Sequence, residues 1–180
     1  NGYDALRRTT HITQTDGTVI RTSYKYTQTA IIDEASRQTI QAVDGLGRMV
    51  EAKQFTGTYS GAPGWNDTAY VRATYQYDAA DRLTRLDDVT LNATTWITYN
   101  MAGWKTAMKD PDMGVWEYGY DGDGLLTVQK DARSPAKVAC FYYDTLHRLT
   151  GKYYQDTSMT CPGSPTLNVT YTYDQGTNGV

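Results

Sequence analysis

The chain has 180 residues, which is enough for one or two ordinary domains with a core. Its formal net charge of -3 does not supply the basic face that nucleic-acid binding needs, and no apolar run approaches the roughly 18 residues of a membrane span. With 16 Tyr, 2 Phe and many Thr, the composition favours half-buried β-strands. We therefore expect an all-β protein with no nucleic-acid partner and no membrane span in this segment.

A short motif recurs along the chain, in which an aromatic or apolar residue precedes an Asp and an Arg follows that Asp by four positions. The close copies pair Asp4 with Arg8, Asp44 with Arg48, Asp78 with Arg82 and Asp144 with Arg148, and the first of them begins at Tyr3. Looser copies begin at Ile32, Tyr99, Tyr120 and Tyr173, the last with Asp174. Tyr77, Tyr99, Tyr120 and Tyr143 are separated by 22, 21 and 23 residues. Self-similarity at a fixed period indicates a repeat protein.

The residues before the Asp alternate between aromatic or apolar and polar. Such pairs are Tyr24-x-Tyr26, Tyr75-x-Tyr77, Ile97-x-Tyr99, Tyr118-x-Tyr120, Phe141-x-Tyr143 and Tyr171-x-Tyr173. A period of two places both side chains of a pair on one face of a strand. Each unit of about 22 residues is therefore expected to contain two strands and two turns.

The Asp itself is suited to turning the chain, because its carboxylate can accept backbone N–H groups in an Asx-turn. Gly47, like Gly103 and Gly124, falls where a positive φ would close the hairpin. The Arg that follows can either reach back to the Asp or lie over a tyrosine ring. Trp104 and Leu125 occupy the Arg position in two looser copies, so the motif is interpreted as architecture.

No constellation of residues indicates chemistry. Asp121-Gly-Asp-Gly124 is similar to the start of a calcium loop, but Ala132 stands where the loop needs an acidic residue. His11 and His147 are isolated, with no triad-like partner. We therefore expect no catalytic residue, no metal site and no cofactor.

Tyr-Asp-x-x-x-Arg-Leu at this spacing, together with the linking segment from Asp110 to Arg133, resembles the RHS (YD) repeats of bacterial surface and toxin proteins and of teneurins. The resemblance implies a twisted antiparallel sheet of successive hairpins that spirals as part of a β-shell. In toxin members such a shell encloses an effector that is released after self-cleavage at a core motif, and no run in this sequence resembles that motif. The chain is thus expected to be one repeat array, residues 1–180, from within a longer protein.

Two stretches interrupt the repeats, at about residues 54–70 and 157–167. The first is rich in Gly, Pro and Asn, which indicates a long loop, and its rings Tyr59, Trp65 and Tyr70 could either stack on a sugar or pack back onto the sheet. The second contains Cys161, 21 residues after Cys140. A disulfide between the two would pin this insertion and would fit an exported protein, and two free thiols are the alternative.

These observations favour a non-catalytic structural segment of an RHS-repeat shell that encloses or displays an effector or adhesion module. The expected location is extracellular or at the cell surface. The expected partners are the remaining repeats of the same chain and an enclosed toxin domain. The alternative is a carbohydrate-binding module of a surface adhesin.

Overall fold

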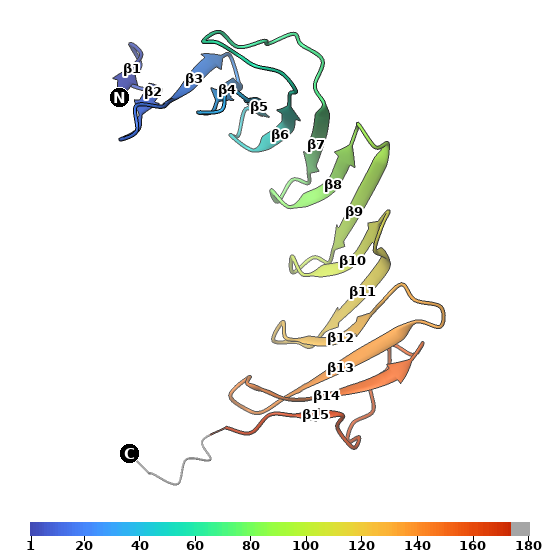
Figure 1. The fold of residues 1–180 in the computed structure, drawn as a ribbon. Coiled ribbons are helices and arrows are strands. Elements are labelled where there is room, and N and C mark those ends of the chain that lie inside the picture. Colours follow the sequence, from blue (N-terminus) through green and yellow to red (C-terminus); the bar gives the residue numbers. More distant parts are fainter. Residues whose placement is uncertain (174–180) are drawn as a thin grey trace, which may run out of the picture. The chain divides into compact units, whose positions relative to one another are not determined.

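The computed structural model describes residues 1–173, so the predicted motif residue Asp174 lies outside the described residues. All regular elements are β-strands, labelled β1 to β15 in Figure 1. The fifteen strands form one sheet in which the order of the strands is their order in the chain. Neighbouring strands run antiparallel, and β1 and β15 stand at the two ends of the order, so the sheet is not closed. The prediction of an all-β antiparallel array of hairpins is confirmed.

The chain divides into two compact units at Thr94/Thr95. The strands of the first unit are β1 (Gly2–Tyr3), β2 (Thr9–Thr13), β3 (Val19–Lys25), β4 (Gln28–Ile32), β5 (Gln38–Val43), β6 (Met49–Gln54), β7 (Val71–Tyr77) and β8 (Leu83–Asp88). Strand β9 (Ala93–Tyr99) begins at the boundary and is followed in the second unit by β10 (Lys105–Asp110), β11 (Gly114–Tyr120), β12 (Leu126–Lys130), β13 (Lys137–Tyr143), β14 (Leu149–Asp156) and β15 (Val169–Thr170). None of the residues described here forms a helix able to cross a membrane.

Most motif turns and the insertions lie at opposite ends of the strands within each unit. Asp4, Asp44 and Asp78 begin the turns that follow β1, β5 and β7, whereas residues 55–70 connect β6 to β7. Because successive antiparallel strands reverse direction, turns after odd-numbered strands lie at one end of the strands and turns after even-numbered strands lie at the other end. The turn at Asp33, after β4, is the exception, because it lies at the end of the strands that also carries the insertion. The second unit has its insertion between β14 and β15.

A second kind of Asp turn occurs after even-numbered strands, at the end of the strands that also carries the insertions. The Oδ1 atom of Asp110 accepts the N–H groups of Asp112 and Met113, and Gly114 closes the turn with a φ of 73°. In the first unit, Asp88 accepts the N–H groups of Thr90 and Leu91 in the same way. Each turn of this kind lets the next strand return with few residues.

Two small apolar clusters form where the insertions cover the sheet. In the first unit Ala30 and Ile40 are almost fully buried together with Phe55. In the second unit Val138 and Cys140 are fully buried beside Val128. Each insertion thus supplies a local second layer for a sheet that buries little apolar surface elsewhere, as the low hydrophobic content of 39% requires.

The expectation that Tyr24 and Tyr26 share a strand face is wrong. Strand β3 ends at Lys25, and Lys25 pairs directly with Gln28, so Tyr26 stands in a two-residue turn. Its φ is 53° and its side chain is 95% exposed. The strand therefore ends one residue earlier than the sequence pattern predicted. The two residues of the turn include no Gly, Asn or Asp, which are the usual signals of a tight turn.

Candidate functional site

The repeated motif is the candidate functional feature of this chain, and it forms a compact locked turn. In the first copy the Oδ1 atom of Asp4 accepts the N–H groups of Leu6 and Arg8, both at 2.9 Å. The Oδ2 atom accepts Nε of Arg8 at 2.7 Å, and the N–H of Asp4 donates to the carbonyl oxygen of Arg8. The side chain and the backbone of one Asp thus close the whole turn.

The turn between β7 and β8 shows the same bonds. The Oδ1 atom of Asp78 accepts the N–H groups of Ala80 at 2.9 Å and Arg82 at 3.0 Å. Its Oδ2 atom accepts Nε of Arg82 at 2.7 Å, in an ion pair whose two side chains are both mostly shielded from solvent. The N–H of Asp78 donates to the carbonyl oxygen of Arg82. Arg82 therefore has a structural role in its turn, as the sequence predicts.

The same set of bonds recurs in other copies. It joins Asp33 to Arg37, Asp44 to Arg48 and Asp144 to Arg148. In the two copies without Arg, Asn100 and Asp121 keep the backbone part: the N–H of Trp104 donates to Asn100 and that of Leu125 donates to Asp121. The Asp or Asn acceptor is therefore the constant part of the turn, and the ion pair is an addition.

The third residue after the Asp has a positive φ in every described turn of this kind. Gly47, Gly103 and Gly124 occupy the position with φ values of 82°, 89° and 86°. Arg7, Ser36, Asp81 and His147 occupy it with φ values of 60–62°. His147 occupies this turn position, where the sequence aligns it with Asp81 and Gly47. A side chain in this conformation carries a backbone cost that Gly avoids.

The Arg of one hairpin also covers the tyrosine of the next. The guanidinium of Arg8 lies 4.1 Å from the ring centroid of Tyr24, and that of Arg48 lies 5.0 Å from Tyr77. Both uses that the sequence left open for the Arg thus occur together. In the copy with Trp104 the indole takes this place, 5.4 Å from the ring of Tyr120.

A tyrosine of the following hairpin makes a bond that sequence reasoning missed. Its hydroxyl donates to the backbone carbonyl of the residue that comes directly after the Arg position of the preceding hairpin. The pairs are Tyr24 to Thr9, Tyr77 to Met49, Tyr120 to Lys105, Tyr143 to Leu126 and Tyr173 to Leu149, at 2.8–3.0 Å. The preference for Tyr over Phe, 16 against 2, was the signal that could have revealed it.

Electrostatics hold the turn carboxylates in their charged form. The backbone N–H of Arg8 lowers the pKa of Asp4, and the side chain of Arg8 acts in the same direction against the effect of burial. The backbone N–H of Arg148 likewise lowers the pKa of Asp144. Hydrogen bonds to the ionised form favour it, so these groups stabilise the turns in neutral solution.

The remaining predicted motif tyrosines are less uniform. Tyr75, Tyr99 and Tyr118 are half-buried, and Lys105 lies 4.4 Å above the ring of Tyr118. Tyr3 is 62% exposed in the short strand β1. The expectation that Tyr171 and Tyr173 lie in one strand is wrong, because β15 ends at Thr170, and both residues are exposed. Among these tyrosines, the ones in strands near the middle of the strand order are thus more buried than the ones near its two ends.

The second insertion is fixed to the sheet covalently. Cys140, in β13, and Cys161 form a disulfide with their Cα atoms 5.8 Å apart. The hydroxyl of Tyr142 donates to the carbonyl oxygen of Pro162 at 2.6 Å, which fixes the same part of the insertion. Met159 packs on the apolar cluster beneath.

The first insertion holds two of its three rings against the sheet. Tyr59 and Trp65 pack on the cluster of Ala30, Ile40 and Phe55, and only Tyr70 is largely exposed, at 65%. The hydroxyl of Tyr59 also donates to Asp67 at 3.0 Å. The three rings do not form one exposed platform.

Within residues 1–173 no group of three or more His, Cys, Asp or Glu side chains could hold a metal ion. Asp121 is engaged with the N–H groups of Asp123 and Leu125, as in a turn. The motif residues that the structure brings together therefore bind the backbone and one another.

Comparison with known proteins shows the fold. No family model and no curated protein matches this chain. The solved structure "TcdB2-TccC3-Cdc42" is similar over 93% of this chain with a TM-score of 0.67 and 17% identity. The Photorhabdus luminescens Tc holotoxin pore with the mutation TccC3-D651A is similar over 93% of this chain, with a TM-score of 0.67 and 16% identity. The chain spans 9% of the length of each of these two. These similarities show the fold, an open antiparallel β-sheet of the kind that builds the RHS-repeat shell of these toxin complexes.

Proposed function

We propose that this chain is a non-catalytic segment of the wall of an RHS-type shell, in a secreted or cell-surface bacterial protein whose shell encloses an effector domain. The observation that carries the proposal is the use of the repeated polar residues. Asp44, Arg48 and Tyr77 are all engaged in closing a turn or in joining one hairpin to the next. Residues used in this way build a continuous wall, because each unit is stabilised by its neighbour.

The similar structures support the enclosed partner. One of these structures is TcdB2-TccC3 without its hypervariable C-terminal region. The complete TcdB2-TccC3 protein therefore has a variable segment at its C-terminal end. By analogy, the remaining repeats of the same protein would complete the wall around a domain of this kind. The analogy rests on fold, since the identity is 16%.

The disulfide supports an extracellular or cell-surface location. Disulfides persist in oxidising compartments and are rare in the bacterial cytosol. Cys140 is fully buried and joined to Cys161, so the bond is part of the packing of β13 and the insertion.

Protease protection of the full protein that carries this chain tests the proposal. If the repeats form an enclosing wall, a non-repetitive domain that follows them resists digestion in the native particle and is cleaved once the particle is denatured. Peptide mapping of the native polypeptide identifies that domain. Repeats that continue to a surface anchor, or a domain that is digested equally fast in both samples, would contradict enclosure.

The alternative of a carbohydrate-binding adhesin module receives no support from the first insertion. Stacking on a sugar needs exposed rings, whereas Tyr59 and Trp65 pack on the sheet. Glycan binding that is lost in Trp65→Ala, in a chain that remains folded, would revive this alternative.

A further inference from the structure

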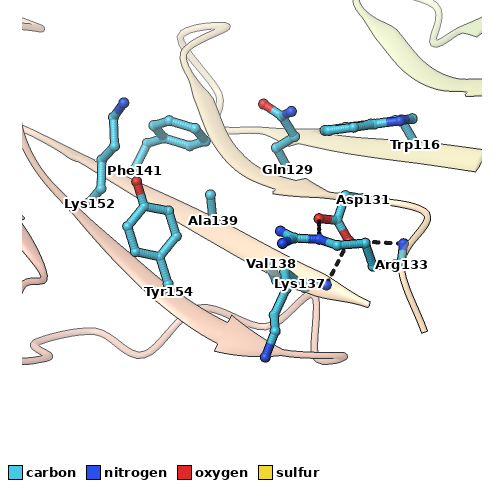
Figure 2. Close-up of a pocket in the computed structure, with 10 residues that line it drawn as sticks. All are labelled: Trp116, Gln129, Asp131, Arg133, Lys137, Val138, Ala139, Phe141, Lys152 and Tyr154. Carbon is cyan, nitrogen blue, oxygen red and sulfur yellow. Dashed lines mark hydrogen bonds and ion pairs between the residues drawn. The ribbon is translucent and has the colours of Figure 1, made fainter. Parts of the chain in front are cut away.

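The two cysteines of the disulfide differ in how far solvent can reach them. Cys140 is fully buried, whereas Cys161 is half-buried and lines an open hollow of about 490 Å³ in the second unit. Figure 2 shows a different hollow, which Ala139 and Phe141 line on one face of β13. Cys140 lies between these two residues in sequence, so it points to the opposite face, where the insertion covers it. A small molecule in solution therefore meets the disulfide at the sulfur of Cys161.

The surroundings of Cys140 make it a poor leaving group in thiol–disulfide exchange. Cys140 is buried in one cluster with Val128 and Val138, and Tyr153 and Met159 pack against this cluster. A thiolate is disfavoured in apolar surroundings, because burial penalises its charge. Exchange slows when the leaving thiolate is less stable. The bond is therefore expected to open slowly, through attack on Cys161.

The hollow beside Cys161 is acidic. Asp121, Asp123 and Asp144 line it, and none of the described residues that line it is Lys or Arg. Arg148 pairs with Asp144 at 2.7 Å, whereas Asp121 accepts backbone N–H groups, which carry no net charge. Carboxylates repel an approaching anion, and salt weakens this repulsion. A thiol that carries an acidic group in addition to its thiolate is therefore repelled more strongly than a thiol that does not.

We propose that Cys161 is a thiol-exchange site that reacts with neutral or cationic dithiols and discriminates against acidic ones. The thiolate of the dithiol forms a bond to Sγ of Cys161, the bond to Cys140 breaks, and Cys140 leaves as a thiolate that takes up a proton. The second thiol of the reductant loses its proton, attacks the reductant's own sulfur in the mixed disulfide and releases Cys161, which is protonated in turn. The protein disulfide is reduced by two electrons, and the dithiol is oxidised to a cyclic disulfide.

Opening the bond removes one attachment of the second insertion. The hydrogen bond from Tyr142 to Pro162 remains, but the insertion is then free to move away from Val128 and Val138. A monothiol achieves less, because Cys140 stays close to the mixed disulfide and closes the bond again. The covering of β12 and β13 thus depends on the kind of thiol present, and acidic monothiols such as glutathione open it least.

Dihydrolipoamide and dihydrolipoate test the proposal, because they share one dithiol and differ in a terminal charge. His147 also lines the hollow, 3.5 Å from Asp123, so the reaction is run at about pH 8, where imidazole groups are ordinarily uncharged. Mass spectrometry of the purified chain measures the rate of reduction. We expect the rate ratio of amide to acid to be roughly two- to fivefold higher for the native chain than for the urea-unfolded chain at low salt, and to approach the unfolded value at high salt. Equal ratios for the native and unfolded chains would overturn the selectivity.

Asp123→Asn assigns the effect to this hollow, because removing one carboxylate should bring the ratio closer to that of the unfolded chain. Asp112→Asn is the matched control. Asp112 is an exposed residue of the same unit whose N–H donates to Asp110, as the N–H of Asp123 donates to Asp121, but it does not line the hollow. A ratio that changes equally in the two variants would contradict the assignment.

Peptide mapping identifies the sulfur that is attacked in the unaltered chain. After brief exposure to the monothiol mercaptoethanol and an acid quench, we expect the mixed disulfide at Cys161. A mixed disulfide mainly at Cys140 would overturn the proposal, whatever the variants show. Neither outcome bears on the shell function, which protease protection tests separately.

Discussion

Tyr77 donates its hydroxyl hydrogen bond to the carbonyl oxygen of Met49 at 2.8 Å, across 28 residues of sequence. The guanidinium of Arg48, one residue before Met49, covers the same ring and also pairs with Asp81 at 2.6 Å. One tyrosine therefore joins the hairpin of β7 and β8 to the hairpin of β5 and β6. The stability of this chain is expected to depend on such contacts between neighbouring hairpins more than on one common hydrophobic core.

Tyr77→Phe should lower the free energy of unfolding by about 1 kcal/mol, because it leaves the carbonyl oxygen of Met49 without its donor. Urea unfolding followed by circular dichroism measures the change. Tyr26→Phe is the control, since Tyr26 is 95% exposed in a turn, and it should shift the transition by much less. Equal shifts for both variants would mean that the hydroxyl bond does not join the hairpins.

Asp144→Ala should lower the melting temperature more than Asp144→Asn. The Asn variant keeps an oxygen that can accept the N–H groups of Leu146 and Arg148 and loses only the ion pair, whereas Ala loses both. Asn100, which accepts the N–H of Trp104 in its own turn, shows that Asn can serve there. Differential scanning calorimetry gives the order, and an Asn variant as unstable as Ala would assign the stability to the ion pair instead.

Gly47→Ala should cost about 1 kcal/mol, because Gly47 has a φ of 82° and an L-residue is strained there. No atom lies within 4 Å of a Cβ built at Gly47, so the expected cost is one of backbone conformation alone. Gly45→Ala, in the same turn with equally open surroundings and an ordinary φ, is the matched control and should be neutral or slightly stabilising. A destabilised Gly45→Ala would point to a contact elsewhere.

The free energy of unfolding of this chain should decrease as the pH falls below about 4. The pKa values of Asp4, Asp33 and Asp144 are lowered in the folded chain, mainly by backbone N–H groups of the following Arg residues. The unfolded chain therefore takes up protons first, near the ordinary Asp value of about 3.9, and acid favours unfolding. Their stabilising contribution is fully present above that value and is lost as the pH falls through the folded-state pKa.

Urea midpoints measured from pH 7 to pH 3 check this dependence. Asp144→Asn removes one of the titrating groups, so its stability should fall less steeply with acid than that of the unaltered chain. A midpoint that does not change down to pH 3 would mean that the turn carboxylates have the same proton affinity in both states.

Reduction of the disulfide should lower the stability of the second unit by about 3 kcal/mol, because a bond between residues 21 apart limits the unfolded chain. Limited proteolysis should then cut within residues 157–168 first, while residues 55–70 keep their rate. Cys140→Ala/Cys161→Ala without reductant should behave like the reduced chain. Unchanged proteolysis of 157–168 would show that Tyr142 and the apolar contacts hold the insertion without the disulfide.

The fold could be predicted from sequence because its signals are local. Asp78, the positive-φ residue Asp81 and Arg82 stand within five positions, and the period repeats this set in register. Tyr26 was misplaced because a two-residue turn without Gly carries no such signal. The acceptors of the tyrosine bonds could not be predicted because a backbone carbonyl leaves no mark in the sequence, whereas the excess of Tyr over Phe did mark the donors.

The acceptors of the tyrosine bonds have a consequence for how such a chain diverges. The residues that supply these carbonyls are Thr9, Met49, Lys105, Leu126 and Leu149, which include a hydroxyl, an ammonium group and apolar side chains. Since every amino acid offers the same carbonyl, mutation at these positions leaves the acceptor in place. Among the residues that join the hairpins, the donor and the turn residues are therefore under chemical constraint, whereas the residues that supply the carbonyls can change. A sheet held in this way can keep its architecture at 17% identity, as the comparison with TcdB2-TccC3-Cdc42 illustrates.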